Sequence, residues 1–238
     1  MNPSEPPPDP SNRSAALAQY RRRASVYDLE LKPFESVRLA AVARLALRRG
    51  DVVFDVGCGT GLSVPLLRQA IGARGHIVGI EQSPEMMARA RQRVQQHGWR
   101  NVTLIEAPVA DAELHRSASA ALFHFTHDIL RDARALEHVA RHLQAGAKVV
   151  ACGLKWARPW AWPVNLFVLG AALHSVSSLD GLVQPWSLLA ERLDAVQVES
   201  LAAGAVFLAS GVLRGPGRGG ASGTSGTSGT SGISGTGA

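Results

Sequence analysis

Residues 52–61 read VVFDVGCGTG, and this stretch decides the fold. Its first residues are strong β-formers and predict a buried strand that ends at Asp55. Glycine at every second position from Gly57 to Gly61 predicts a turn stripped of side chains, and the apolar periodicity of residues 62–71 predicts a helix. A strand, a glycine turn and a helix N-terminus together form a cradle in which a ligand contacts backbone N–H groups.

A second acidic residue closes the next predicted strand. Residues 76–80 are a short apolar run, and Glu81 follows them, twenty residues beyond Gly61. A carboxylate at this offset is placed to accept two hydrogen bonds from a ribose diol. A glycine turn alone would indicate no more than a tight connection, but the turn, the two acids and the strands agree on a nucleoside-containing ligand.

The heptapeptide D-V-G-C-G-T-G of residues 55–61 separates two families that share this cradle. Dinucleotide-binding folds carry G-x-G-x-x-G, whereas this chain has G-x-G-x-G with an acid two residues before the first glycine. That arrangement resembles the first motif of class I S-adenosylmethionine-dependent methyltransferases of the small-molecule and lipid type. The resemblance extends over about residues 20–213, and it implies S-adenosylmethionine as cofactor and methyl transfer as activity.

The chain divides into three regions by composition. Residues 1–13 are proline-rich and polar, which predicts disorder. Residues 214–238 consist mostly of Gly, Ser and Thr with an approximate SGT repeat, and such a segment cannot bury a core. We therefore expect one methyltransferase domain over residues 14–213, with residues 155–180 as an insert or lid on the acceptor side.

The alternation of strand and helix patterns predicts a doubly wound, Rossmann-like α/β fold. Five strands, at 52–56, 76–80, 101–105, 120–125 and 148–153, should form a parallel sheet, and 196–202 with 206–212 should add an antiparallel hairpin, giving seven strands. Helices are expected at 14–31, 34–47, 62–71, 84–97, 128–143 and 185–193, with Ser83 as N-cap and Pro84 at the first helical position. In such a sheet the ligand lies where strand order reverses, here between the first and fourth strands.

The resemblance assigns the glycine turn and its neighbours to the cofactor. Gly57, Gly59 and Gly61, with Cys58 between them, would lie under the methionine portion. Asp55 would face the amino group or stabilise the turn, and Glu81 would bind the ribose hydroxyls.

The adenine and the sulfonium are assigned to later segments. Gln82 would border the base and Met86 would form its apolar wall, although Met86 also suits an ordinary helix core. Asp111, with Glu113 as the alternative, would meet the adenine amino group. Phe125 and Thr126 would lie at the sulfonium, and Tyr27, one of two tyrosines with Tyr20 on the N-terminal helix, would either fold over the cofactor or tie that helix to the domain.

His127 is the candidate catalytic residue. It lies at the carboxyl edge of the sheet, where a histidine acts as general base for an acceptor hydroxyl or amine. The alternative is a packing or capping role for His127, and Asp128 is expected as the N-cap of the following helix. Methyl transfer from a sulfonium asks little of a base, because alignment of the acceptor in a dry pocket supplies much of the rate.

The acceptor is expected to be a small molecule or a lipid. Residues 155–179 carry Trp156, Trp160 and Trp162 before an apolar segment, a pattern that suits either a lid helix or an interfacial helix at 156–173. One hypothesis is a methyltransferase for a small apolar or quinone-like acceptor. The second is a peripheral enzyme of the inner membrane face that resembles bacterial phosphatidylethanolamine N-methyltransferases, and the third is a non-catalytic cofactor-binding domain.

Several other classes are disfavoured. The net charge is +6 with a pI near 10.1, but the basic residues, 22 Arg and 3 Lys, are scattered rather than gathered in a stripe that a nucleic acid would need. Residues 125–128 read F-T-H-D, where amino-methylating enzymes of nucleic acids carry N-P-P-Y or D-P-P-Y. Cys58 and Cys152 have no metal-site spacing, and no signal peptide or membrane-spanning run is recognised, so we expect a cytoplasmic protein without a metal.

Overall fold

The computed structural model describes residues 34–157 and 182–215, which build one α/β sandwich around a seven-stranded sheet. The strands are β1 (Val52–Val56), β2 (His76–Glu81), β3 (Val102–Glu106), β4 (Ala118–His124), β5 (Leu143–Leu154), β6 (Leu193–Leu201) and β7 (Val206–Leu213). The helices are α3 (Glu35–Arg44), α4 (Val64–Ile71), α5 (Pro84–Gln96), α6 (His127–Leu130), α7 (Ala133–Arg141) and α9 (Ser187–Ala190), with short 3-10 turns at Val109–Asp111 (η2) and Ala202–Gly204 (η3).

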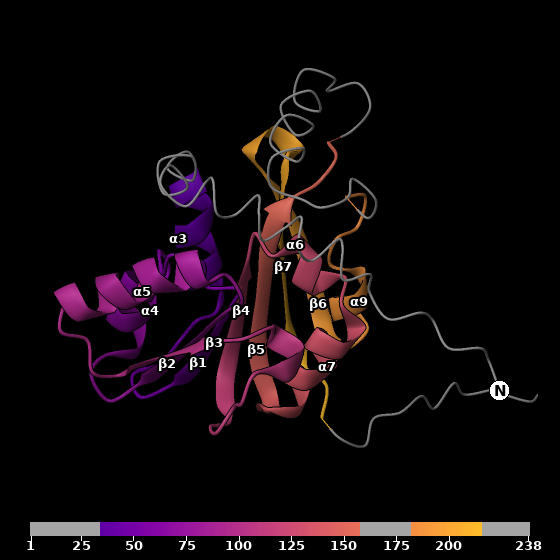
Figure 1. The fold of residues 1–238 in the computed structure, drawn as a ribbon. Helices are drawn as coiled ribbons and strands as arrows, with labels where there is room; N and C mark the ends of the chain where they lie inside the picture. Colours follow the sequence, from indigo (N-terminus) through magenta and orange to yellow (C-terminus); the bar gives the residue numbers. More distant parts are fainter. Residues whose placement is uncertain (1–33, 158–181, 216–238) are drawn as a thin grey trace, which may run out of the picture.

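The strand order is β3-β2-β1-β4-β5-β7-β6 (Figure 1). Strands β1 to β5 pair in parallel, whereas β7 is antiparallel to both β5 and β6. The predicted doubly wound sheet with a terminal antiparallel hairpin is confirmed. The reversal of strand order falls between β1 and β4, as predicted, so the carboxyl ends of these strands form the crevice of the fold.

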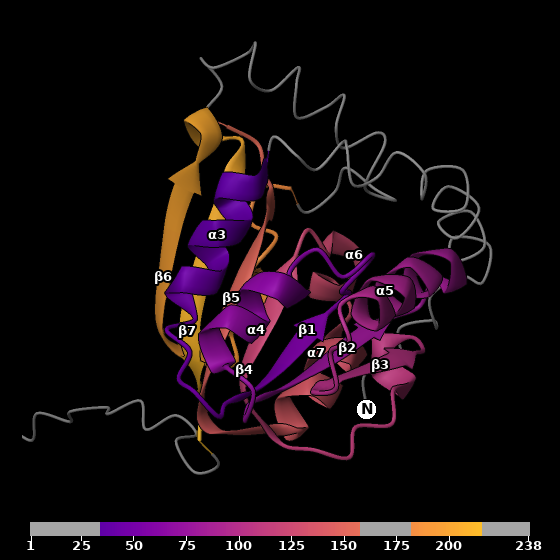
Figure 2. The same cartoon turned by 90° about the vertical axis from the view of Figure 1, so that its left-hand side faces the viewer.

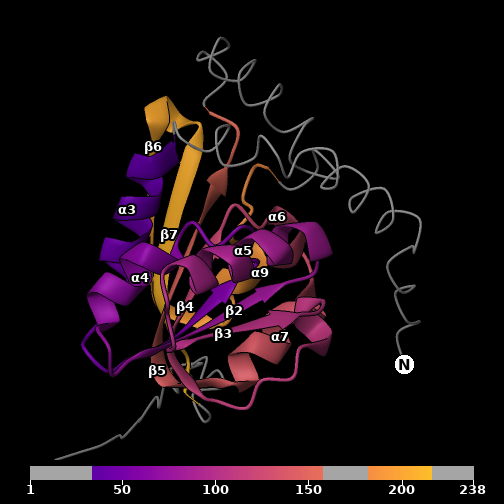
Figure 3. The ribbon, with the colours of Figure 1, turned by 60° about the vertical axis from the view of Figure 1, so that its left-hand side comes forward.

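The two faces of the sheet are covered by different helices. Helices α3, α4 and α5 follow one another along one side (Figures 2 and 3), whereas α6, α7 and α9 lie on the other (Figure 1). Side chains alternate along each strand, so Val53 packs toward α3 and α4 and Phe54 toward α7. This alternation also decides which polar residues at the strand ends lie beneath α3.

Helix α5 begins as the sequence predicts. Ser83 is its N-cap, with its Oγ accepting from the N–H of Met86 at 3.3 Å, and Pro84 is the first helical residue. Helix α4 instead begins at Val64, two residues later than predicted, because the glycine turn continues through Gly61.

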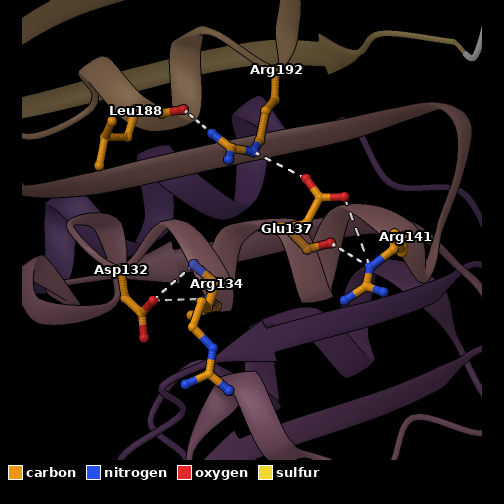
Figure 4. Close-up of polar contacts among 7 residues, drawn as sticks. Asp132, Arg134, Glu137, Arg141, Leu188 and Arg192 are labelled. Atoms are coloured by element: carbon orange, nitrogen blue, oxygen red, sulfur yellow. Dashed lines mark hydrogen bonds and ion pairs between the residues drawn. The ribbon is translucent and has the colours of Figure 1, made fainter. Parts of the chain in front are cut away.

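The single helix predicted for residues 128–143 is wrong, because the chain forms two helices there. The Asp132 carboxylate accepts from the N–H groups of Arg134 at 2.8 Å and Ala135 at 3.1 Å, which starts α7 afresh (Figure 4). Asp128 is not an N-cap, since Thr126 occupies that position of α6. The sequence pattern missed this break because an aspartate cap leaves the apolar periodicity on both sides intact.

The C-terminal elements also shift. Strand β5 begins five residues earlier than predicted, at Leu143, and α9 is confined to Ser187–Ala190 because β6 already starts at Leu193. Arg192, between them, donates from Nη1 to the Leu188 carbonyl at 2.7 Å and lies 3.8 Å from a Glu137 carboxylate oxygen on α7 (Figure 4). Contacts of this kind at the surface contribute at most about 1 kcal/mol, so apolar packing holds these elements in place.

Replacing Asp132 by alanine should lower the free energy of unfolding by about 1 kcal/mol, because two N–H groups of α7 lose their acceptor. Urea unfolding followed by circular dichroism measures the change. Asp132→Asn is the matched control, since asparagine also caps helices and should restore most of the loss. Equal destabilisation by both variants would contradict the capping role.

Candidate functional site

The glycine turn after β1 is held by its neighbours on both sides. Gly57, Gly59 and Gly61 all have positive φ, at 69°, 57° and 77°, a region that favours glycine. The Cys58 N–H donates to the Ile80 carbonyl at 2.9 Å, which fixes the turn to the end of β2. The backbone conformation therefore requires the three glycines that the sequence singled out.

Gly57 meets a second constraint, which the sequence did not reveal. A Cβ at this position would lie 2.4 Å from the Thr126 Cγ2 and 2.8 Å from the Ile129 Cδ1. The turn after β1 thus packs directly on the connection from β4 to α6. The absence of a side chain at Gly57 serves this internal contact, in addition to the ligand approach predicted for the turn.

Glu81 joins the glycine turn to the start of α5. Its Oε2 accepts from the Gly59 N–H at 3.0 Å and its Oε1 from the Ser83 N–H at 2.8 Å. Burial raises the pKa of this carboxyl, whereas the backbone donors at Ser83 and Gly59 oppose the rise. The Gln82 backbone N–H also acts on this carboxyl and lowers its pKa. A carboxylate offers about four lone-pair sites, so capacity for a further donor remains.

Asp55 is the buried acid of the site. It is 1% exposed, and among the residues that the structure describes its Oδ2 has no hydrogen-bond partner. Burial raises its pKa from 3.8 to about 7; the Arg38 cation opposes this rise and the Glu81 charge adds to it. An unpaired carboxylate oxygen at the carboxyl end of β1 is a position that a bound cation would satisfy.

Two buried residues beside Asp55 were missed by the sequence reasoning. Arg38 of α3 is 2% exposed, and His124 at the end of β4 is nearly as buried. Arg38 occupies the same helical stripe as Ala41, Val42 and Leu45, which recurs at helical spacing. A cation within an apolar stripe was the available signal, and it passed unnoticed because only the apolar members of the stripe were considered.

The residues after β4 adopt a strained turn. Phe125 has φ of +59°, which is rare for a residue other than glycine, and its N–H donates to the Cys152 carbonyl at 2.8 Å. Its ring lies 4.9 Å from those of Phe34 and His124. The turn brings the buried Thr126 onto Gly57, so the structure places Phe125 and Thr126 beside the glycine turn.

His127 packs tightly inside the domain. It is 5% exposed, its Nε2 lies 2.8 Å from the Leu154 carbonyl, and a Cβ at Gly153 would lie 2.6 Å from its Cε1. A carbonyl only accepts, so Nε2 carries the proton, and Nδ1 of the neutral ring holds a lone pair. Burial lowers the pKa of His127. This packing agrees with the alternative role expected for His127, and its role as general base stays a prediction.

The remaining candidates divide by burial. Met86 is buried in α5, and Gln82 is half-buried beside Glu81. Cys58 packs on Met87 and Leu104, and burial with the Asp55 and Glu81 charges raises its thiol pKa well above the usual range. Cys58 therefore contributes its backbone rather than a reactive thiolate.

The two acids proposed for the adenine amino group are turned to other partners. Asp111, at the end of η2, is 59% exposed and lies 3.7 Å from Arg134 of α7. Glu113 is more exposed still and lies 3.9 Å from His115. Within the described part of the chain, no hydrogen bond or ion pair joins either acid to Glu81 or the glycine turn. Tyr20 and Tyr27, together with Trp160 and Trp162, lie outside the described residues.

Within the described ranges, 34–157 and 182–215, no helix is long and apolar enough to cross a bilayer. In the same residues no group of three or more His, Cys, Asp or Glu side chains gathers closely enough to hold a metal ion.

Replacing Asp55 by asparagine should stabilise the ligand-free protein above pH 7. A carboxyl whose pKa rises on folding contributes stability that is lost as pH increases through the folded pKa, here about 7. The neutral amide avoids that loss, so at pH 8 the variant should exceed wild type by at least about 1 kcal/mol. At pH 5 both side chains are mostly neutral in the folded state and the gain should shrink. Thermal melts across this range measure it, and a less stable variant at pH 8 would contradict the burial of a charged Asp55.

Comparison with known proteins agrees with this geometry. Residues 53–146 match the family model described as a methyltransferase domain, the segment that contains β1, the glycine turn and Glu81. Over 59 residues the chain is 42% identical to a protein-L-isoaspartate O-methyltransferase of Ignicoccus hospitalis, covering 25% of this chain and 28% of the relative. Over 84 residues it is 38% identical to a phosphatidylethanolamine N-methyltransferase of Cereibacter sphaeroides, covering 35% and 39%. The matches span well under half the length of either relative.

The fold has counterparts among solved structures. One is N-methyltransferase NodS from Bradyrhizobium japonicum in complex with S-adenosyl-L-homocysteine, with a TM-score of 0.56, 17% identity, and coverage of 77% of this chain and 90% of that one. The matched segment, the strand order and the turn after β1 agree with one another: residues 53–146 form a methyltransferase domain, and the sheet has the fold of class I S-adenosylmethionine-dependent methyltransferases.

Proposed function

We propose that this protein transfers a methyl group from S-adenosylmethionine to a small-molecule acceptor. The observation that carries the proposal is the arrangement of Asp55, the glycine turn and Glu81 around the carboxyl ends of β1 and β2. An acid with an unpaired oxygen, a turn without side chains and an acid with spare lone pairs follow one another along this edge. These three features match the ammonium, the chain and the ribose of the cofactor in that order.

The residues fit the cofactor by their chemistry. Glu81 would accept from the ribose hydroxyls with the lone pairs that Gly59 and Ser83 leave unused. Asp55 would accept from the ammonium group through its unpaired Oδ2. Gln82 and Met86, at the start of α5, would border the adenine, as the sequence predicts. Asp111 is a weaker candidate for the adenine amino group, because its carboxylate faces Arg134.

Bound at this site, the cofactor supplies an activated methyl group. The protein contributes alignment of the acceptor and exclusion of water, which together account for much of the rate in such displacements. Phe125 and Thr126 sit on the strained turn beside Gly57 and would shape the wall of the reacting end. His127 would accept a proton at Nδ1, because its Nε2–H is engaged by the Leu154 carbonyl and its lowered pKa keeps the ring neutral at pH 7.

The acceptor class is proposed from what surrounds Trp156. Its backbone N–H donates to the Leu182 carbonyl at 3.0 Å, which fixes the main chain there, and its side chain packs half-buried against the core. A half-buried indole at this place suits a covered acceptor pocket for a small molecule. The similarity to the phosphatidylethanolamine N-methyltransferase supports a lipid headgroup as the second candidate. In that case residues 156–173 would contact the membrane.

The cofactor assignment is tested at Glu81 with S-adenosylhomocysteine and its 2′-deoxy analogue. Wild type should bind the deoxy analogue about 10- to 100-fold more weakly, since a hydrogen bond to a carboxylate contributes about 1.5–3 kcal/mol. Glu81→Gln should lose most of this discrimination. Isothermal titration calorimetry measures both affinities. Because the comparison of ligands in wild type needs no variant, equal affinity there would sink the assignment even if Glu81→Gln fails to fold.

The acceptor is tested with isotope-labelled methyl donor in cell extract, with lipid and aqueous products separated. We expect label in the aqueous fraction. Label in the lipid fraction, together with sedimentation of the protein with anionic liposomes, would favour the headgroup alternative. Binding of S-adenosylhomocysteine without transfer to any fraction would favour a non-catalytic cofactor-binding domain and overturn the proposal.

A further inference from the structure

A buried cation lies next to the proposed cofactor site without adequate partners. Arg38 of α3 is 2% exposed, and its only hydrogen bond to a described residue runs from Nη1 to the carboxylate of Glu35 on the same helix. Its Nε and Nη2 have no partner. A guanidinium presents five donors in a fixed fork, and leaving buried donors of a charged group unpaired is costly. Such a group calls for an explanation, and a bound anion is one.

Strand alternation shows which residues lie beneath Arg38. Asp55, His124 and Cys152 lie within two residues of the carboxyl ends of three neighbouring strands, β1, β4 and β5, and register places all three on the face covered by α3. The Arg38 charge acts on each of them: it lowers the pKa of Asp55 and Cys152 against the effect of burial, and with burial it brings the pKa of His124 to about 3. Arg38 therefore lies over the carboxyl ends of the strands that form the crevice.

Arg38 and Asp55 are nevertheless not paired with each other. Within the described residues no hydrogen bond or ion pair joins them, and each keeps unpaired polar atoms. Desolvated opposite charges normally pair directly, because separation forfeits their attraction while the cost of burial remains. A cation and an anion held apart in one buried region are complementary to a ligand that carries both charges, with its carboxylate toward Arg38 and its ammonium toward Asp55.

We propose that Arg38 binds the α-carboxylate of the methionine portion of S-adenosylmethionine, and that this contact selects ligands with an intact amino-acid end. The inference rests on the proposed function, since it places the ammonium at Asp55. Arginine suits the task because its planar fork matches a carboxylate in a bidentate manner, whereas a lysine offers only a point charge. The neutral His124, whose Nε2 is also unpaired, completes the polar lining of this end of the site.

The test compares three ligands that share the nucleoside thioether. They are S-adenosylhomocysteine, its decarboxylated form, which keeps the amine, and 5′-methylthioadenosine, which lacks both groups. Wild type should bind the first about 10- to 100-fold more tightly than the decarboxylated form. In Arg38→Met the ratio should fall to near one, with the affinity for 5′-methylthioadenosine within about twofold of wild type. Arg38→Lys should restore part of the ratio.

The matched control is Arg44→Met, on the same helix. Arg44 is half-exposed and pairs with Glu199 of β6, away from the crevice, so its removal should leave the ligand ratio unchanged. Calorimetry supplies the affinities, and circular dichroism reports whether each variant is folded.

The outcomes separate this inference from the proposed function. If wild type binds none of the three ligands, the proposed function fails. If wild type binds S-adenosylhomocysteine and its decarboxylated form with similar affinity, or if Arg38→Met keeps the wild-type ratio, the proposed function stands and the role of Arg38 is overturned. Should Arg38→Met not fold, the wild-type ratio and the partial recovery in Arg38→Lys still decide.

Discussion

The site depends on one carboxylate that bridges two backbone segments. Glu81 accepts from the N–H of Gly59 in the turn after β1 and from the N–H of Ser83 at the start of α5. The two bonds fix the turn relative to β2 and orient the carboxylate along the sheet edge. Without this bridge, a turn with three glycines in five residues would have many accessible conformations, and the cradle would have to be ordered by the ligand at an entropic cost.

Several features close to Glu81 lower the free energy of unfolding. Asp55 carries a pKa of about 7 because its charge is buried, Arg38 and Thr126 keep unpaired polar atoms, and Phe125 holds a left-handed backbone conformation. Each feature disfavours folding by an amount of order 1 kcal/mol or more. These unfavourable features lie together at the carboxyl ends of β1, β4 and β5, whereas the sheet face under α7 is packed with apolar side chains. Proteins tolerate such local costs at functional sites, so their concentration at one edge indicates a preformed polar site.

The sequence predicted the fold well because its signals are local. Strand β1, the turn and α5 each follow from residues that decide their own conformation: β-formers, glycines, and a serine followed by proline. The break between α6 and α7 was missed because it depends on a single side-chain cap at Asp132. The contact of Gly57 with Thr126 was missed because it joins segments almost seventy residues apart, which no local pattern reports.

The burial of Arg38 could have been predicted from the sequence. Each apolar neighbour in its stripe of α3 faces the core, so the helical period alone places a guanidinium inside the protein. The same logic applies to Asp55, an acid inside a run of β-formers, which was recognised because the adjacent glycines drew attention to it. A charged residue in phase with a buried stripe has to be compensated by a partner or by a ligand. Arg38 has an opposite charge nearby, Asp55, but no hydrogen bond or ion pair joins the two in the described residues. A bound ligand therefore explains both buried charges better than an internal ion pair does. Such a ligand carries a negative group that faces Arg38 and a positive group that faces Asp55.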